Sequence, residues 1–186
     1  MPHEAISVFD MFKIGVGPSS SHTLGPWRAA LQCIEHLRTT QLINQVQHIQ
    51  VLLYGSLAKT GKGHGTDIAV LLGLAGEDPV TIDVNTITPT IEALQQTHQM
   101  LLGKTHNITL NPATDVVFLM NESLPFHPNG MTFLVQLQNG EAIAQTYYSI
   151  GGGFVVQEAT NNQTTSPTVE LPFPINTAND LLHWCM

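Results

Sequence analysis

The spacing of apolar residues changes near residue 106, and this change limits the folds that the chain can adopt. Before it, helical spacing predicts three helices, at 26–39, at 66–76 and from Thr88-Pro89 to Gly103, with one strand near 47–54. After it, alternating spacing predicts strands at 107–110, 115–121, 131–138 and 141–150. Strands and helices do not alternate strictly, so we expect an α+β fold with a mixed or antiparallel sheet and helices on one side.

The last two predicted strands are separated by Asn139-Gly140. Both residue types tolerate the positive φ that a two-residue hairpin turn requires. The pattern therefore predicts a β-hairpin formed by 131–138 and 141–150.

The composition favours a small polar ligand over a nucleic acid or an anionic membrane. The 186 residues are 42% hydrophobic, enough for a core, and six Lys and Arg face fourteen Asp and Glu, for a net charge of −8. No apolar run approaches the roughly 20 residues that span a bilayer, and the first residues lack a signal-peptide pattern, so we expect a cytoplasmic protein. Cys33 and Cys185 lie far apart and predict neither a disulfide framework nor a thiolate zinc site, and Cys33 is expected in the core.

Two histidines stand in glycine-bounded segments ahead of predicted helices. Residues 15–25 read G-V-G-P-S-S-S-H-T-L-G, and residues 61–67 read G-K-G-H-G-T-D. Hydroxyls and N–H groups beside a helix N-terminus suit a carboxylate or phosphate, although a serine-rich loop can also be a plain surface connection. His22 and His64 could each accept a proton near neutral pH or simply bond a nearby carbonyl. No third ligand at a metal-binding spacing accompanies them.

Other polar positions are less specific. Residues 127–131, H-P-N-G-M, predict a turn, and the three glycines in 147–154 indicate either a bulge or a close backbone contact. His98 is interpreted as a residue of the third helix. Residues 157–176 are polar and Pro-rich, as in a linker or strap, and 177–186 begin a helix that stops early, which suggests the start of a missing element.

Four stretches together resemble the beta domain of the iron-sulfur-dependent L-serine dehydratases (L-serine ammonia-lyases). They are S-V-F-D-M-F-K-I-G-V-G-P-S-S-S-H-T-L-G-P at 7–26, G-H-G-T-D at 63–67, H-P-N-G-M at 127–131 and Y-Y-S-I-G-G-G-F-V at 147–155. The resemblance implies a beta domain over 1–156, similar to the allosteric substrate-binding domain of some phosphoglycerate dehydrogenases. In that family, three cysteines of a catalytic alpha domain hold a 4Fe-4S cluster, and neither cysteine of this chain matches them. We therefore expect a separate beta subunit or a truncated part of a fused enzyme, and the interrupted helix favours truncation.

The resemblance also implies a function, the deamination of L-serine to pyruvate and ammonia together with an alpha domain in cis or in trans, in a homodimeric complete enzyme. His22 and His64 are then catalytic, one as the base and the other orienting substrate or returning a proton. We favour His64 as the base because its flanking glycines permit close approach. The predicted substrate-binding residues are Ser19, Ser20, Ser21, Thr23, Thr66, Asp67 and Asn129. The alternative function is a regulatory module that binds serine without turning it over.

Overall fold

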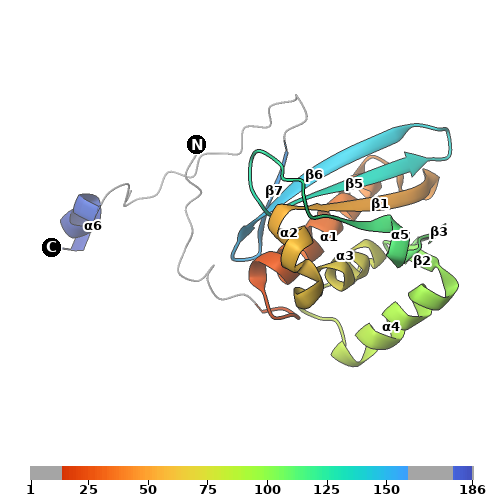
Figure 1. The fold of residues 1–186 in the computed structure, drawn as a ribbon, viewed down its shortest axis with the longest axis horizontal. Helices are drawn as coiled ribbons and strands as arrows, with labels where there is room; N and C mark the ends of the chain where they lie inside the picture. The colour runs from red at the N-terminus through yellow and green to blue at the C-terminus, as the bar shows by residue number, and fades with distance from the viewer. Residues whose placement is uncertain (1–13, 159–177, 186) are drawn as a thin grey trace. The chain divides into compact units, whose positions relative to one another are not determined.

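The computed structural model describes residues 14–158 and 178–185 (Figure 1). The second range is a helix, α6 (Ala178–Cys185), which belongs to a different unit from residues 12–158 and is considered by itself. It confirms the helix predicted near 177–186. Most of the predicted linker lies outside the described residues, and the proposed domain boundaries stay predictions.

Five α-helices and seven strands make up the larger unit (Figure 1). The helices are α1 (Gly25–Thr39), α2 (Gly55–Thr60), α3 (Thr66–Ala75), α4 (Val84–Thr97) and α5 (Pro112–Asp115). The strands are β1 (Val46–Tyr54), β2 (Gln99–Leu102), β3 (His106–Thr109), β4 (Val116–Leu119), β5 (Gly130–Leu137), β6 (Ala142–Gly151) and β7 (Phe154–Gln157). Short helical turns are η2 (Ser20–Leu24), η3 (Ile43–Gln45) and η4 (Gly61–His64).

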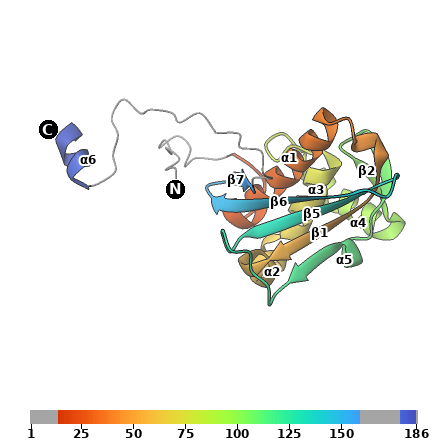
Figure 2. The same ribbon diagram turned by 90° about the horizontal axis from the view of Figure 1, so that it is seen from above.

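The main sheet has the strand order β4-β1-β5-β6-β7, and only β1 and β4 run parallel. Helix α1 packs against β5, β6 and β7, and α3 packs beside α1 on the same side of the sheet (Figure 2). The predicted α+β fold, a mixed sheet with helices on one side, is confirmed. The likeness to the domain of phosphoglycerate dehydrogenases stays a prediction.

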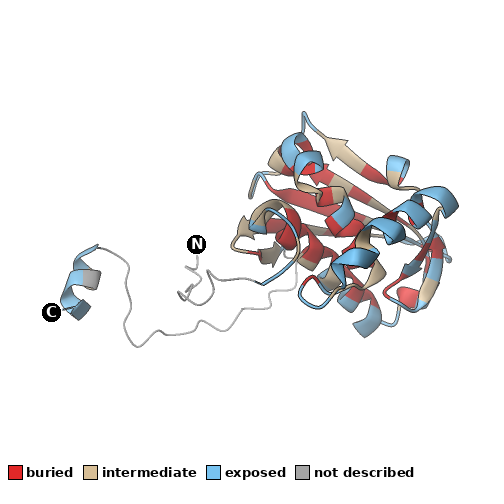
Figure 3. Ribbon diagram, turned by 90° about the horizontal axis from the view of Figure 1, so that it is seen from below, coloured by how far each residue is buried: buried red, intermediate tan, exposed pale blue. Residues whose placement is uncertain are grey.

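The core lies between this sheet and its helices (Figure 3). Ile49, Val51 and Leu53 of β1 are fully buried, as their alternate spacing predicts. The intervening residues His48, Gln50 and Leu52 are half-buried. Burial on α3 extends around most of the helix, which agrees with its almost wholly apolar sequence.

Helix α4 differs from the predicted third helix at both ends. It begins at Val84 because the Asp83 side chain accepts a hydrogen bond from the Asn85 N–H at 2.9 Å, which leaves Pro89 inside the helix. It ends at Thr97, and His98 follows with φ of 52°. The predicted segment as far as Gly103 is therefore wrong beyond residue 97, because Gln99–Leu102 form strand β2 instead.

The predicted hairpin of β5 and β6 is confirmed, but its turn is longer than two residues. The paired positions end at Gln136 and Ala142. Gly140 has a φ of 88°, whereas Asn139 accepts the Glu141 N–H at 2.9 Å through its side-chain oxygen. This longer turn has a single positive φ, at Gly140, where a two-residue turn of type I′ would need two.

The three consecutive glycines lie where β6 ends and a second hairpin, with β7, begins. Gly152 and Gly153 have φ of 57° and 73° and make the turn, which side chains would strain. The register also shifts between Ser149 and Gly151, and a side chain on Gly153 would come 2.8 Å from Leu24. Both expected features, a bulge and a close contact, are present.

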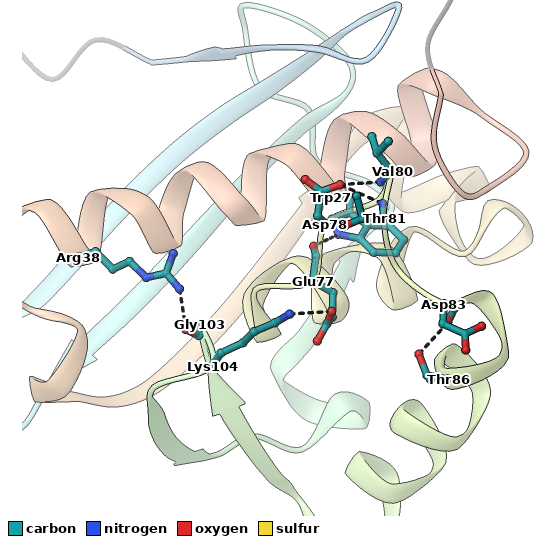
Figure 4. Close-up of polar contacts among 10 residues, drawn as sticks. All are labelled: Trp27, Arg38, Glu77, Asp78, Val80, Thr81, Asp83, Thr86, Gly103 and Lys104. Carbon is teal, nitrogen blue, oxygen red and sulfur yellow. Dashed lines mark hydrogen bonds and ion pairs between the residues drawn. The ribbon is translucent and has the colours of Figure 1, made fainter.

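Polar contacts fix α1 to the segments around β2 (Figure 4). Trp27 Nε1 donates to the Glu77 carbonyl at 2.7 Å, and the Glu77 carboxylate pairs with Lys104 at 2.9 Å. Near the other end of α1, Arg38 donates to the Gly103 carbonyl at 2.6 Å. These contacts hold the helix whose N-terminus follows the His22 segment.

Candidate functional site

The predicted histidine segments meet at one edge of the main sheet. Because β1 is antiparallel to β5, the C-terminal end of β1 lies beside the N-terminal end of β5, where the Ser56 N–H donates to the Pro128 carbonyl at 2.9 Å. Turn η2 packs on α1, α3, η4 and β6 at this edge. The topology therefore brings the 19–25, 55–66 and 127–130 segments together.

The serine-rich segment contains a π-helical turn where the sequence predicts only a loop. The Leu24 N–H donates to the Ser19 carbonyl at 3.1 Å, and the Ser19 hydroxyl accepts the His22 N–H at 3.1 Å. The turn then continues directly into α1. Single π-helical turns are rare and often occur at functional sites.

The imidazole rings of His22 and His64 lie side by side, with centroids 5.1 Å apart and planes inclined by 39°. The sequence placed both in glycine-bounded segments ahead of helices, and the structure brings the two together. A ligand that touches one ring is within reach of the other.

The His64 ring has its neutral tautomer set by the backbone. Its Nδ1 lies 2.9 Å from the Thr60 carbonyl, which can only accept a hydrogen bond, so Nδ1 carries the proton. In the neutral ring, Nε2 then keeps its lone pair. Gly65, with φ of 65°, ends η4 and turns the chain into α3 directly after this histidine. His64 is thus arranged to accept a proton at Nε2.

His22 is held at both ring nitrogens by serine hydroxyls. Nδ1 lies 2.9 Å from Ser21 Oγ, and Nε2 lies 2.9 Å from Ser56 Oγ. Burial, and to a smaller degree the neighbouring His64, lower the pKa of His22, although a hydrogen bond with Ser56 opposes the shift. Sequence reasoning missed Ser56, but its position directly after a buried strand and a glycine could have indicated it.

The lowered pKa of His22 predicts a pH effect on stability. Between that pKa and the ordinary value of 6.5, the unfolded chain binds more protons at this position than the folded chain does. The free energy of unfolding therefore rises with pH in this window, and the contribution is lost as pH falls through the lowered pKa. On acidification from about pH 7.5 to about pH 5.5, wild type should lose more stability than His22→Gln in urea denaturation. Equal losses in the two proteins would contradict the assignment.

The remaining predicted hydroxyls fall into two groups. Thr23 and Thr66 are buried and donate to the backbone carbonyls of His64 and His22, respectively. Ser20 is exposed on η2, and Ser19 and Ser21 are half-buried. The serines, rather than the threonines, face the solvent side of the site.

Asn129 and Asp67 have contacts other than the ring pair. Asn129 is buried, donates through Nδ2 to the Ser149 carbonyl at 3.1 Å and accepts the Ser149 N–H at its own carbonyl at 3.0 Å. Asp67 lines a separate cavity of about 440 Å³ with Lys62 and His98. Neither has a hydrogen bond to His22 or His64, and their predicted substrate contacts stay predictions.

The cysteines do not fit an iron-sulfur cluster, which needs several thiolate ligands. Cys33 is fully buried in the core, as predicted, and burial raises the pKa of its thiol to about 12. Cys185 is exposed on α6. Over residues 14–158 and 178–185, no three His, Cys, Asp or Glu side chains are grouped to hold a metal ion.

The helices within residues 14–158 and 178–185 do not meet the requirements for crossing a membrane. None of these helices combines the length and the apolar character needed to cross a bilayer.

Comparisons with known proteins identify the family of the chain. Residues 7–160 match the family model described as serine dehydratase beta chain. The chain is 42% identical to L-serine dehydratase 1 of Escherichia coli, 44% to L-serine dehydratase of Streptomyces coelicolor and 36% to that of Helicobacter pylori. These matches cover 96% to 97% of the chain but only 40% of each relative. The chain therefore belongs to the serine dehydratase beta chain family.

Proposed function

We propose that this chain supplies the substrate-binding and proton-transfer groups of an L-serine dehydratase, which converts L-serine to pyruvate and ammonia. The observation that carries the proposal is the His22 and His64 ring pair, in which the Thr60 carbonyl directs the proton of neutral His64 to Nδ1. The names of the relatives support the same substrate and reaction.

The proposed chemistry is a β-elimination. His64 Nε2 takes the weakly acidic Cα proton of serine, and the electron pair forms a double bond to Cβ. The β-hydroxyl leaves as water with a proton that the histidine pair returns, so the pair ends with the protons it began with. The resulting aminoacrylate becomes an imine, which water hydrolyses to pyruvate and ammonia. We favour His64 as the base because its tautomer is set by a carbonyl, whereas both His22 nitrogens contact hydroxyls.

The serine hydroxyls and His22 are proposed to hold the substrate. Ser19, Ser20 and Ser21 lie at the turn before α1, where the positive end of the helix dipole favours a carboxylate. The lowered pKa of His22 keeps that ring neutral near pH 7, so it can orient the substrate through a hydrogen bond, and it returns a proton only after it has first accepted one.

The complete enzyme is proposed to need a partner sequence. Because the chain spans 40% of its relatives, an alpha domain in cis or in trans would supply the rest, including the ligands of a 4Fe-4S cluster. Cys33 is too deeply buried to serve as such a ligand. A homodimer and a cytoplasmic location are part of the same proposal.

A complementation assay tests the proposed function. Pyruvate formation from L-serine is measured with this chain alone, with the remaining sequence of the enzyme alone, and with both. We expect turnover only in the mixture, because the base and the other half of the machinery lie on different segments. Turnover by the remaining sequence alone, altered but not created by this chain, would instead identify a serine-binding regulatory module.

A further inference from the structure

Each histidine of the pair has its backbone carbonyl bound by a threonine from the other histidine's segment. Thr23 Oγ1 donates to the His64 carbonyl at 2.8 Å, and Thr66 Oγ1 donates to the His22 carbonyl. Thr23 directly follows His22, and Thr66 lies two positions after His64. The two hydrogen bonds are therefore reciprocal: that of Thr23 links η2 to η4, and that of Thr66 links the start of α3 to η2.

Both donors of these hydrogen bonds are buried. The exposed fraction is 5% for Thr23 and 0% for Thr66. Removing either hydroxyl would take the donor away from the backbone carbonyl of half-buried His64 or His22, a loss that costs stability. The contacts therefore hold η2 and the His64 segment at a fixed separation.

Two glycines make room for the threonines. A side chain on Gly17 would overlap the Thr23 methyl group, and a Cβ on Gly61 would lie 2.9 Å from Thr66 Oγ1. Each threonine is thus confined by close backbone on one side and by its hydrogen bond on the other. The glycines ahead of both histidines serve this packing.

We infer that Thr23 and Thr66 are positioning residues that fix the separation of the two imidazole rings, and not ligands of the substrate. The inference rests on the proposed function, since it matters for turnover only if His64 is the base. Catalysis is sensitive to such placement, because a shift of about 1 Å can cost about 10²-fold in rate. This role is an alternative to the sequence-based assignment of both threonines to substrate binding, which stays a prediction.

Valine variants of the complete enzyme test the inference, because valine keeps the shape of threonine and lacks the hydroxyl. We expect Thr23→Val and Thr66→Val each to lower kcat about tenfold at an unchanged KM for L-serine. Thr23→Ser and Thr66→Ser should keep most of the wild-type kcat, since the donor remains. Thr39→Val is the matched control, because this exposed threonine also donates to a backbone carbonyl, that of His36 at 3.0 Å.

Two results would overturn the inference. Wild-type kcat in both valine variants would show that the hydrogen bonds do not position the rings. A raised KM at unchanged kcat would show that the threonines bind the substrate. The first result together with a lowered melting temperature would show that the threonines have only a structural role.

Gly61→Ala keeps the inference testable if a valine variant does not fold. Gly61 has φ of −60° and ψ of −39°, which alanine adopts readily. The main effect of the substitution is therefore a steric contact between the new Cβ and Thr66. The hydroxyl stays but is displaced, and kcat should again fall at constant KM. Wild-type kcat in Gly61→Ala would overturn the role of Thr66.

Assays of His64→Ala distinguish a failure of the proposed function from a failure of the positioning inference. If that variant keeps wild-type kcat, the proposed function fails and this inference fails with it. If His64→Ala loses turnover while the threonine variants do not, the positioning inference alone is wrong.

Discussion

His64→Ala in the complete enzyme is expected to lower kcat by a factor of about 10²–10⁴, the usual contribution of a positioned general base. The Nε2 lone pair that would accept the Cα proton of serine disappears. Because His64 is only partly buried, the fold should survive the change. The measurement is kcat for pyruvate formation, together with the melting temperature of the variant.

His36→Ala is the matched control for this prediction, since His36 is an exposed histidine on α1. It should leave both kcat and the melting temperature close to wild type. A His64→Ala enzyme with near-normal kcat would show that His64 has only a structural role at this edge of the sheet.

Trp27→Ala is expected to reduce the free energy of unfolding by about 3–5 kcal/mol, as is typical for a buried aromatic residue. Trp27 is 1% exposed and lies at the start of α1, and its indole N–H also bonds the Glu77 carbonyl. Urea denaturation measures the change. Trp27→Phe should cost less, because most of the apolar contact remains and only the hydrogen bond, worth about 1 kcal/mol, is lost with part of the ring volume.

Val84→Ala provides the comparison, since Val84 is 60% exposed at the start of α4. Its effect should stay within about 0.5 kcal/mol. A Trp27→Ala change as small as that of Val84→Ala would mean that the contact of α1 with the end of α3 contributes little to stability.

The elements that could be predicted are those with local causes. The apolar periodicity and flanking Pro26 and Gly76 located α1 and α3 to within one residue. The strand β2 was missed because its two leucines also fit a helical stripe. Its boundaries depend on positive φ at His98 and Lys104, a backbone conformation that is uncommon for residues other than glycine and that the sequence alone does not indicate at these two positions.

The candidate site also has features that the sequence predicts and features that it does not. His22 and His64 could be found because glycines and helix starts surround them in the sequence. The contacts of Ser56 and Thr60 with the rings could not be predicted from the sequence. They depend on the positions that β1 and α2 take in the folded domain. The carbonyl partners of Thr23 and Thr66 likewise arise only from tertiary packing.

The hairpin of β6 and β7 has a consequence for the order in which the molecule assembles. Arg28 of α1 donates to the Gly153 carbonyl, 125 positions along the chain, and η2 packs on β6. Contacts of such long sequence separation form slowly, because a large loop must close first. The surroundings of His22 are therefore completed only when almost the whole domain has been synthesised and paired, so a nascent chain that ends before β6 carries the histidines without their final support.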